Sequence, residues 1–327
     1  MSAVLNPLTD REAWLDARRR CITATDVSAI VRKNPYSSPL DVYLVKTGQK
    51  REPEQTGAME WGLRLEEVIA RKFADKNGVE PRPAGFMVKE DEPIFGATPD
   101  YYITTTHGDQ DETALLECKT CNFFVGKQEF GEEHSDHVPD RYVIQCQWQL
   151  MVTGRKVCHL AVLIAGSDYR EYTIERNEEL ILNLQLRART FWHEYVMADN
   201  PPPLTGDKAD TDWLKGQFPE DDGGAVRATE AIEKEVDALG TDLRALKALG
   251  EVAEGRKNRI KQFMGEASVL DTSQGAITWR KAKDGQKTDW KAVAAALGAS
   301  EDLIMNHTSP TKGSRRFIVP KEVTEDV

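Results

Sequence analysis

The sequence lacks the features that mark several common classes of protein. Acidic residues outnumber basic ones, 54 to 43, and the formal net charge is −11. This balance argues against a protein that coats nucleic acid through its overall field, although it leaves room for an enzyme with a local basic channel. The five cysteines are odd in number and irregularly spaced. We therefore expect no secreted-type disulfide framework, and a reducing cytoplasm fits better.

Long apolar runs and several catalytic motifs are also missing. No stretch approaches the roughly 18 consecutive apolar residues of a membrane span, and no basic segment followed by an apolar run opens the chain. We expect no membrane association and no targeting signal. Cys118 and Cys121 have no second cysteine or histidine pair at zinc spacing. The sequence has neither a glycine-rich phosphate loop nor a nucleophile elbow, so it does not indicate an ATP-driven motor or a serine hydrolase.

The central feature that is present is a predicted β-hairpin. Residues 101–106 are β-branched or aromatic, residues 107–111 are polar and predict a turn, and residues 113–119 predict a second strand. The second strand is largely apolar. An isolated pair of charges inside such a strand is costly unless the charges have a use.

The predicted hairpin brings two charged residues and a further acid close together. Because side chains alternate along a strand, Glu117 and Lys119 share one face, roughly 6.5 to 7 Å apart, while Cys118 points to the other. Asp100 follows Pro99 at the mouth of the partner strand, within reach of Glu117 in a twisted hairpin. Two such carboxylates suit Mg²⁺ or Mn²⁺. Taken alone, the pattern also fits an exposed, solvated strand face.

The segment before the hairpin contains a basic turn next to a predicted helix start. Residues 12–20 predict a short helix that ends in three arginines, and Thr25 or Asp26 is expected to cap a second, apolar helix. A helix N-terminus beside arginines favours phosphate binding. An ordinary cap beside a solvated basic turn fits the same residues equally well.

A longer helix is predicted for residues 58–77 by its apolar period, and it ends at a glycine. It carries Glu66 and Glu67. Because adjacent helical residues point about 100° apart, only one of the two can face a site that the helix covers.

A helix is also predicted for residues 139–153, after a loop that is rich in phenylalanine. Tyr142, Gln145 and Gln149 form a polar stripe on it at near-helical spacing. Such a stripe is suited to a water or a phosphate, or to plain solvent exposure.

The remaining elements predict an α/β core. One strand is expected within residues 79–88, a buried strand at 157–164 and a further strand at 171–174, followed by an amphipathic helix at 177–197. The order of helices and strands indicates a mixed central sheet flanked by helices.

Composition predicts the domain boundaries. Residues 1–198 form the predicted core domain, and residues 199–224 are an acidic linker rich in proline and glycine. Residues 225–327 predict a helical arm, with a short coiled-coil-like seam that is interrupted at Gly240, and a small α+β module that ends in a strand at 315–319. The basic residues of this part suit either a nucleic-acid strand or a solvated face.

Several short motifs, taken in order, resemble those of one known family. They are Arg18 with Ile22-Thr23-Ala24-Thr25-Asp26, Trp61-Gly62 with Glu66, Thr98-Pro99-Asp100, Glu117-Cys118-Lys119, and Tyr142-x-x-Gln145-x-Gln147. Each is weak alone, but the combination resembles the YqaJ-type viral recombinases, relatives of the lambda-type exonucleases that are built on the PD-(D/E)xK nuclease core. The resemblance covers roughly residues 11–197. Thr25 stands where some relatives have serine.

The resemblance implies a metal site. Asp100, Glu117 and the backbone carbonyl of Cys118 would hold one Mg²⁺, and Glu66 would join a second. Lys119, together with a glutamine of the following helix, would position the attacking water.

The glutamine that the resemblance implies for positioning water is Gln145. The resemblance also implies a DNA site. Arg18 and Thr25 would bind a terminal 5′-phosphate, and Tyr142 would be a further DNA contact.

The implied activity is a Mg²⁺-dependent 5′→3′ exonuclease acting on double-stranded DNA ends in phage-type recombination, which passes the exposed 3′ strand to a single-strand annealing protein. Such relatives are often ring-shaped, commonly trimeric, and this one would be a cytoplasmic phage or prophage protein of a bacterial host. Two alternatives are an endonuclease of nicking or restriction type on the same core and a binding module without chemistry. The presence of Glu66, Asp100, Glu117 and Lys119 together speaks against the second.

Overall fold

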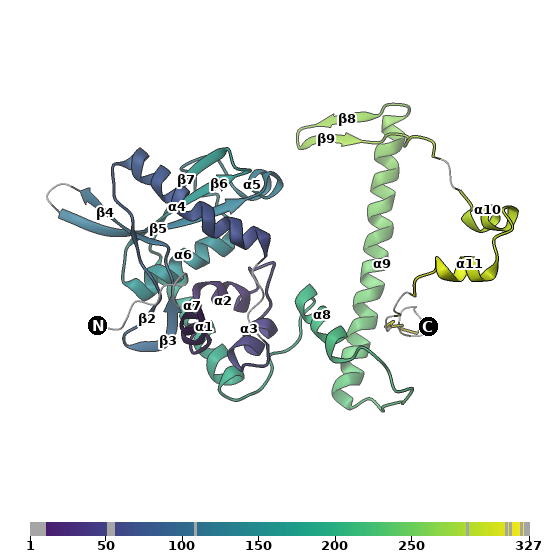
Figure 1. Ribbon diagram of the computed structural model, residues 1–327, viewed down its shortest axis with the longest axis horizontal. Helices are drawn as coiled ribbons and strands as arrows, with labels where there is room; N and C mark the ends of the chain where they lie inside the picture. The colour runs from purple at the N-terminus through teal and green to yellow at the C-terminus, as the bar shows by residue number, and fades with distance from the viewer. Residues whose placement is uncertain are drawn as a thin grey trace. The chain divides into compact units, whose positions relative to one another are not determined.

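The computed structural model describes residues 11–50, 56–107, 110–285, 288–310, 313, 316–320 and 323. The chain divides into two compact units, Met1–Leu214 and Lys215–Val327 (Figure 1). Among the described residues, no helix combines the length and the apolar character that crossing a membrane requires.

A five-stranded mixed sheet lies at the centre of the N-terminal unit. Its strand order is β1-β4-β5-β6-β7. The strands are β1 (Arg82–Pro83), β4 (Tyr101–His107), β5 (Gln110–Cys121), β6 (Val157–Ile164) and β7 (Asp168–Glu175). β5 and β6 are parallel, and the other neighbours are antiparallel. The crossover that a parallel pair needs contains α5 (Phe123–Glu129) and α6 (Asp140–Thr153), so the predicted α/β core with a mixed sheet is confirmed.

The hairpin at the centre of the sequence is confirmed as well. β4 and β5 pair from Tyr101 with Leu116 to His107 with Gln110, which makes both strands longer than predicted. Residues 108 and 109 of the predicted turn lie outside the described residues.

The single strand predicted for residues 79–88 is wrong. The chain there forms β1, which pairs with β4, and β2 (Met87–Lys89), which pairs with β3 (Glu92–Ala97) in a separate two-stranded sheet. Gly85 lies between β1 and β2 with a φ of 75°. This left-handed conformation, which glycine adopts without strain, separates the two short strands.

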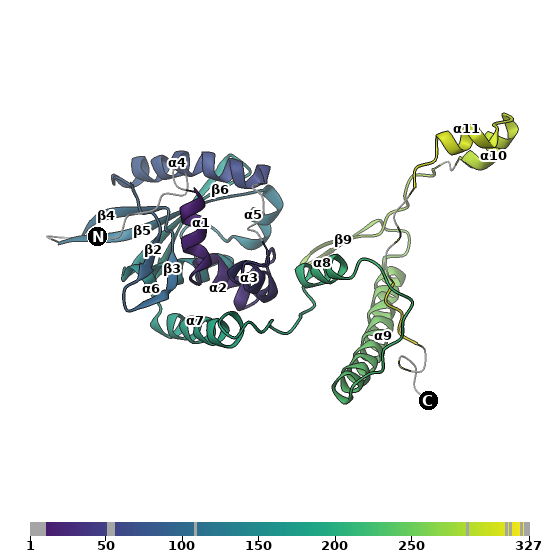
Figure 2. The ribbon, with the colours of Figure 1, turned by 60° about the horizontal axis from the view of Figure 1, so that its bottom comes forward.

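Helices cover both faces of the sheet (Figure 2). α4 (Gly57–Asn77) lies over one face, where Ile69 packs in a buried cluster with Leu116. α6 covers the other face, where Leu150 packs in a second cluster with Leu115. Alternate residues of β5 therefore point to opposite helices, and the residues that follow Leu115 at intervals of two face α6.

Two buried side chains fix α6 in place. Trp148 is 1% exposed, and its Nε1 donates to the carbonyl of Gly96 at 3.0 Å. Gln147 donates to the carbonyl of Glu175 at 2.6 Å and accepts from the backbone N–H of Asn177 at 2.9 Å. These contacts hold the helix against β3 and against the chain after β7, which limits how far its neighbouring glutamines can move.

The other helices complete this unit. They are α1 (Arg11–Arg19), α2 (Ala24–Ile30), α3 (Pro39–Lys46), α7 (Glu178–Phe191) with the π-helical turn η1 (Trp192–Val196), and the part of α8 (Lys208–Gln217) up to Leu214. The loop predicted for the phenylalanine-rich segment is wrong, because this segment contains α5. α5 packs so closely that a Cβ on Gly126 would lie 2.1 Å from Ile164 Cγ2. The predicted linker contains α8, whose buried Asp210 accepts a hydrogen bond from Ser38 Oγ at 2.5 Å.

The C-terminal unit is built on one long helix, α9 (Glu230–Met264). It is followed by the hairpin β8 (Val269–Thr272) and β9 (Gly275–Thr278), by α10 (Trp290–Ala296) and by α11 (Glu301–Asn306). Gly240, where the predicted apolar seam is interrupted, lies within α9. The helix continues through this residue, whose missing side chain lets the carbonyl of Val323 approach. The strand predicted at 315–319 is also wrong for residues 316–319, which have no regular structure, and Arg315 lies outside the described residues.

Candidate active site

Glu117 is the centre of the candidate site. Its side chain is 1% exposed and faces α6. Lys119 Nζ and Gln145 Nε2 both donate to Oε1, and Gln149 Nε2 donates to Oε2 at 2.8 Å. Cys118 packs instead in the cluster beneath α4, which confirms the predicted alternation. A carboxylate buried in a strand is thus matched by one ammonium and two amides.

Asp100 reaches the same place from the strand next to β5. It stands immediately before β4, and its Oδ2 accepts the backbone N–H of Cys118 at 2.8 Å. The register that sets Tyr101 opposite Leu116 carries the carboxylate to this point. The strand pairing therefore brings Asp100 to Glu117, as the hairpin pattern predicts.

The third acid comes from α4. Glu66 is half-buried and lies within electrostatic reach of Glu117 and Lys119. Glu67 is exposed and pairs with Arg71 at 2.5 Å. Of the two adjacent glutamates, Glu66 alone faces β5, as helical geometry requires.

The three acidic side chains are not electrically balanced by the one nearby ammonium group, that of Lys119. Burial raises the pKa of Asp100 well above its usual value, and the Glu117 carboxylate raises it further. Burial and the same carboxylate also raise the pKa of Glu66. Burial alone would lower the pKa of Lys119, but Glu117 and Asp100 raise it above its usual value. The site holds more negative charge than its single ammonium neutralises.

The donor set fits a hard divalent cation. Carboxylate oxygens are the ligands that Mg²⁺ and Mn²⁺ prefer, and an excess of negative charge is what such a cation relieves. Among the described residues, no three His, Cys, Asp or Glu side chains are arranged so that together they could bind a metal ion. The oxygens of Glu117 instead accept from Lys119 and the two glutamines, and Asp100 accepts from a backbone N–H.

The predicted phosphate-binding residues lie together at another point of the same unit. Arg18 NH2 donates to Thr25 Oγ1 at 3.2 Å, and Thr25 is an exposed residue whose Oγ1 also lies 3.2 Å from Thr23 Oγ1. The guanidinium of Arg18 lies 4.5 Å from the centre of the Trp14 ring. Its Nε is buried without a hydrogen-bond partner among the described residues.

The cap predicted for α2 is wrong, because Thr23 is the N-cap residue. The N–H and the Oγ1 of Thr23 donate to Asp26 Oδ2 at 2.7 and 2.6 Å. The fully buried Nζ of Lys46 pairs with the same carboxylate at 2.6 Å and donates to the carbonyl of Arg18 at 2.9 Å. This Lys46 network, made of Thr23, Asp26 and Lys46, ties α1 to α2 and so holds Arg18 beside Thr25.

Tyr142 lies at the rim of the carboxylate site. Its ring centre is 5.8 Å from Lys119 Nζ, and the guanidinium of Arg141 stacks on it at 4.6 Å. The polar stripe of α6 is used differently from the expectation, since Gln145 and Gln149 donate to Glu117.

Two contributing residues have roles that were not predicted. Gln149 stands four residues after Gln145, and this spacing on one helix face was the signal for a shared partner. Lys46 ends a short apolar helix, where a lysine ordinarily interacts with the helix dipole at the surface. The sequence therefore gave no sign that Lys46 is buried.

The structure has a mixed sheet with helices on both faces, an aspartate before β4 and a Glu-x-Lys motif in β5. This is the arrangement that the motif resemblance to the PD-(D/E)xK core predicted. A comparison with protein families gives a more specific result: residues 13–156 match the YqaJ-like viral recombinase domain. Part of the N-terminal unit is thus similar to a YqaJ-like viral recombinase domain. The resemblance drawn from the motifs is confirmed, over a shorter range than residues 11–197.

Individual proteins similar to this chain include the uncharacterized protein YqaJ of Bacillus subtilis, 29% identical over 282 residues, which are 84% of this chain and 85% of that protein. Among solved structures, an alkaline exonuclease from Laribacter hongkongensis aligns with a TM-score of 0.44 and 21% identity, over 63% of this chain and 97% of the other. A phage-related exonuclease from Haemophilus somnus aligns with a TM-score of 0.38 and 13% identity, over 54% and 94%.

Proposed function

We propose that this protein is a Mg²⁺-dependent deoxyribonuclease that degrades one strand of duplex DNA from its 5′ end and leaves a 3′ single strand for recombination. The observation that carries the proposal is the convergence of Glu66, Asp100 and Glu117 on one ammonium, with more negative charge than Lys119 neutralises. The match to the YqaJ-like viral recombinase domain supports the recombination setting.

The proposed metal ligands are Glu66, Asp100, Glu117 and the backbone carbonyl of Cys118. Bound there, Mg²⁺ would stabilise the attacking and leaving oxygens in an in-line hydrolysis of the two-metal type, and Mn²⁺ is the alternative ion. A lysine amine is ordinarily protonated at neutral pH, and Glu117 and Asp100 raise the pKa of Lys119 further. The ammonium therefore offsets charge that develops on the phosphoryl oxygens.

Gln145 and Lys119 are the proposed water-positioning residues. Both donate to Glu117, which limits the positions that their nitrogen atoms can take. Hydrogen-bonding groups that are already oriented need no reorganisation when the reaction occurs, and this is the usual basis of their effect on rate.

Arg18 and Thr25 are the proposed binding site for the terminal 5′-phosphate. The support is the direct hydrogen bond between them, the buried Nε of Arg18 that has no partner among the described residues, and the exposure of Thr25. Guanidinium groups bind phosphate oxygens through several parallel N–H donors. Tyr142, at the rim of the carboxylate site, is the proposed further DNA contact.

The proposed biological setting is a phage or prophage recombination system in the bacterial cytoplasm. The exposed 3′ strand would pass to a single-strand annealing protein. The protein would assemble as a ring-shaped homo-oligomer, a trimer, around the duplex.

One assay tests the activity directly. Linear duplex labelled at either the 5′ or the 3′ end, and covalently closed plasmid, are incubated with the full chain in Mg²⁺ or in EDTA. We expect the 5′ label to be released first as mononucleotide, the closed plasmid to stay intact, and EDTA to stop the reaction. Cleavage of the closed plasmid would favour the endonuclease alternative, and no cleavage of either DNA would overturn the proposal.

A further inference from the structure

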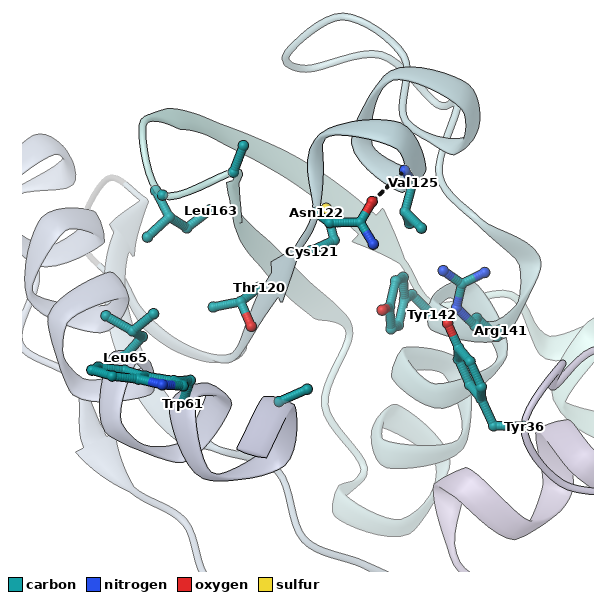
Figure 3. Close-up of a pocket in the computed structure, with 13 residues that line it drawn as sticks. Tyr36, Trp61, Leu65, Thr120, Cys121, Asn122, Val125, Arg141, Tyr142 and Leu163 are labelled. Carbon is teal, nitrogen blue, oxygen red and sulfur yellow. Dashed lines mark hydrogen bonds between the residues drawn. The ribbon is translucent and has the colours of Figure 1, made fainter. Parts of the chain in front are cut away.

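Exposed apolar side chains occur both beside the carboxylate site and on α9. Beside that site, Trp61 is 63% exposed and lines a groove with Tyr142, close to the proposed catalytic residues (Figure 3). α9 lies outside residues 13–156, which match the family, and it exposes six large apolar side chains. They are Ile232, Leu246, Leu249, Val252, Ile260 and Phe263. Soluble proteins rarely leave large apolar patches uncovered, so α9 is expected to have a binding partner.

The apolar residues of α9 follow the seven-residue repeat of a coiled coil. Alternate spacings of four and three residues place them on one side of the helix, where they form a continuous seam. This α9 seam is made of Ile232, Val236, Leu239, Leu243, Leu246, Gly250 and Ala253. It extends over about three heptads, which is long enough to indicate a coiled coil.

The α9 seam is incompletely covered in the part of the chain that the structure describes. Val323 lies beside it, where its carbonyl accepts from Arg244 NH1 at 2.8 Å and approaches Gly240. The middle of the seam is half-buried, but Ile232 is 53% exposed and Leu246 is 64% exposed. A second helix can therefore still pack against the seam.

The charges of α9 are divided between its two halves. Residues 230–242 contain five acidic residues and one basic residue, whereas residues 243–264 contain six basic and two acidic residues. The helix dipole favours acids in the first turn and bases in the last turn, so it does not account for Asp242 and Arg244 near the middle. A helix with this division is complementary to a second copy of itself that runs in the opposite direction.

The size of the seam residues is divided in the same way. Val236 and Leu239 lie in the acidic half, and Gly250 and Ala253 lie in the basic half. In an antiparallel pair, the larger residues of one copy lie opposite the smaller residues of the other, so the seam is filled evenly. In a parallel pair, the small residues would face their own counterparts and the two acidic halves would repel each other.

We propose that α9 binds α9 of a second copy of this chain in an antiparallel, two-fold symmetric pair. The register sets Val236 opposite Ala253 of the other copy and Leu239 opposite its Gly250. Because a two-fold interface uses the same surface of both chains, each of these contacts occurs twice.

The same register produces an ion pair at the edge of the seam. Glu235 directly precedes Val236, and Arg256 follows Ala253 by three residues, so both flank the seam, and both are exposed. Glu235 of one copy then lies across the interface from Arg256 of the other. Charged residues at such flanking positions commonly set the orientation of a coiled coil.

This pairing does not depend on the proposed nuclease activity. It uses residues of the C-terminal unit and joins chains in twos, whereas the proposed ring joins three. If both contacts form, the symmetry requires a particle of six chains, and if only the α9 contact forms, it requires two.

Engineered cysteines test the direction of the pair in the full chain. The variants are Val236→Cys, Ala253→Cys and the double variant, each treated with the thiol oxidant diamide. We expect a disulfide-linked dimer on a non-reducing gel for the double variant alone, because only there do two thiols lie opposite each other. The native cysteines lie in the N-terminal unit, and the wild-type chain and the single variants control for them.

Charge reversals test the proposed ion pair. Glu235→Arg and Arg256→Glu should each raise the dissociation constant of the pair about tenfold, since each replaces two ion pairs by like charges. The two reversals combined should restore the constant to within about threefold of the wild-type value. Arg259→Glu is the control, because it makes the same charge change in the same half of α9 at an outer position of the repeat.

Sedimentation velocity over a concentration series measures the dissociation constants, and a thermal melt checks that each variant is folded. Light scattering gives the number of chains in the wild-type particle at micromolar concentration. Two or six chains would support the proposal, and one or three would overturn it. It would also be overturned if either single cysteine variant cross-linked as well as the double variant, if the double variant gave no dimer, or if the combined charge reversal failed to restore pairing. Equal effects of Arg259→Glu and Arg256→Glu would likewise overturn the register.

Discussion

Two acidic centres of the N-terminal unit use the same kinds of side chain with opposite electrostatic results. Asp26 is held by the buried ammonium of Lys46 and by Thr23, and Lys46 and Arg18 lower its pKa although burial acts to raise it. Asp100 is also withdrawn from water, and burial raises its pKa most; the Glu117 carboxylate raises it further, although Lys119 acts to lower it.

The difference indicates what each centre is for. The Lys46 network is electrically matched within the fold, so removing one partner leaves a buried charge without compensation. The carboxylate site is mismatched within the fold, and an external cation is what would match it. A balanced centre is expected to govern stability, and an unbalanced one to govern activity.

The largest expected effect comes from Asp100→Asn. We expect nuclease activity to fall about 10³-fold or more, since several kcal/mol of transition-state stabilisation at 1.36 kcal/mol per tenfold is lost with a metal ligand. The fold should stay intact, and without divalent ions the thermal midpoint should not decrease. Steady-state digestion of linear duplex and a thermal melt in EDTA measure the two quantities. A folded variant with normal activity would sink the assignment of this site.

The adjacent glutamates of α4 provide a matched pair. Glu66→Gln should lower activity about 10²-fold, because it removes a proposed ligand from the site. Glu67→Gln should leave activity within about twofold, since Glu67 forms an exposed ion pair with Arg71. The digestion assay compares the two variants. Equal losses would contradict the orientation of α4.

The balanced centre is tested through stability. Lys46→Met should lower the free energy of unfolding by about 3 to 5 kcal/mol, because Asp26 then lacks its buried partner. Lys50→Met is the control and should cost less than about 1 kcal/mol, since Lys50 is half exposed in its pair with Asp41. Urea unfolding gives both values. A similar loss of unfolding free energy in the two variants would mean that the buried ion pair of Lys46 with Asp26 does not stabilise the fold more than an exposed pair does.

The pH dependence of stability should differ in sign between the centres. The folded pKa of Asp26 lies below 3.8, so its stabilisation is present above that pH and is lost as pH falls through the folded pKa. The folded pKa of Asp100 lies above 3.8, so ionisation destabilises the fold as pH rises from about 4 through that pKa.

Urea unfolding in EDTA across this pH range measures the prediction. The deficit of Asp26→Asn relative to wild type should shrink as pH falls below about 4. Any advantage of Asp100→Asn should grow as pH rises above about 4. The same pH trend in both variants would remove the distinction between the two centres.

The smallest expected effect concerns recognition of the 5′ end of the DNA strand. Arg18→Ala should slow degradation of 5′-phosphorylated duplex about tenfold more than that of 5′-hydroxyl duplex, as for the loss of one charge-assisted hydrogen bond. Arg19→Ala is the control, because Arg19 already pairs with Asp16 at 2.9 Å. Initial rates on the two ends measure the ratio. Equal slowing of both ends would remove the phosphate-site proposal.

Much of the fold followed from local pattern. Strand alternation predicted the hairpin and the shared face of Glu117 and Lys119, and apolar period predicted α4, α6 and α7. The errors occur where local pattern carries little information. Residues 79–88 divide at Gly85 because their two halves find different partner strands, and α5 forms in a segment whose phenylalanines gave no helical period.

For the candidate site, the sequence indicated the types of residue better than their partners. Gln145 was expected to hold water, but together with Gln149 it donates to Glu117. The burial of Lys46 depends on α1, α2 and α3 meeting in space, and no spacing along the chain encodes that meeting.

The sequence by itself determined the alternation that places an acid and an amine on one strand face, because the geometry of an extended chain is a local property. It also determined that only one glutamate of an adjacent pair can face the sheet. Only the tertiary structure decided that Asp100 reaches the N–H of Cys118, that α6 supplies amides to Glu117, and that Lys46 is buried under Arg18. Each of these contacts joins residues distant in sequence, and its stability depends on how much water the packing of the whole unit excludes.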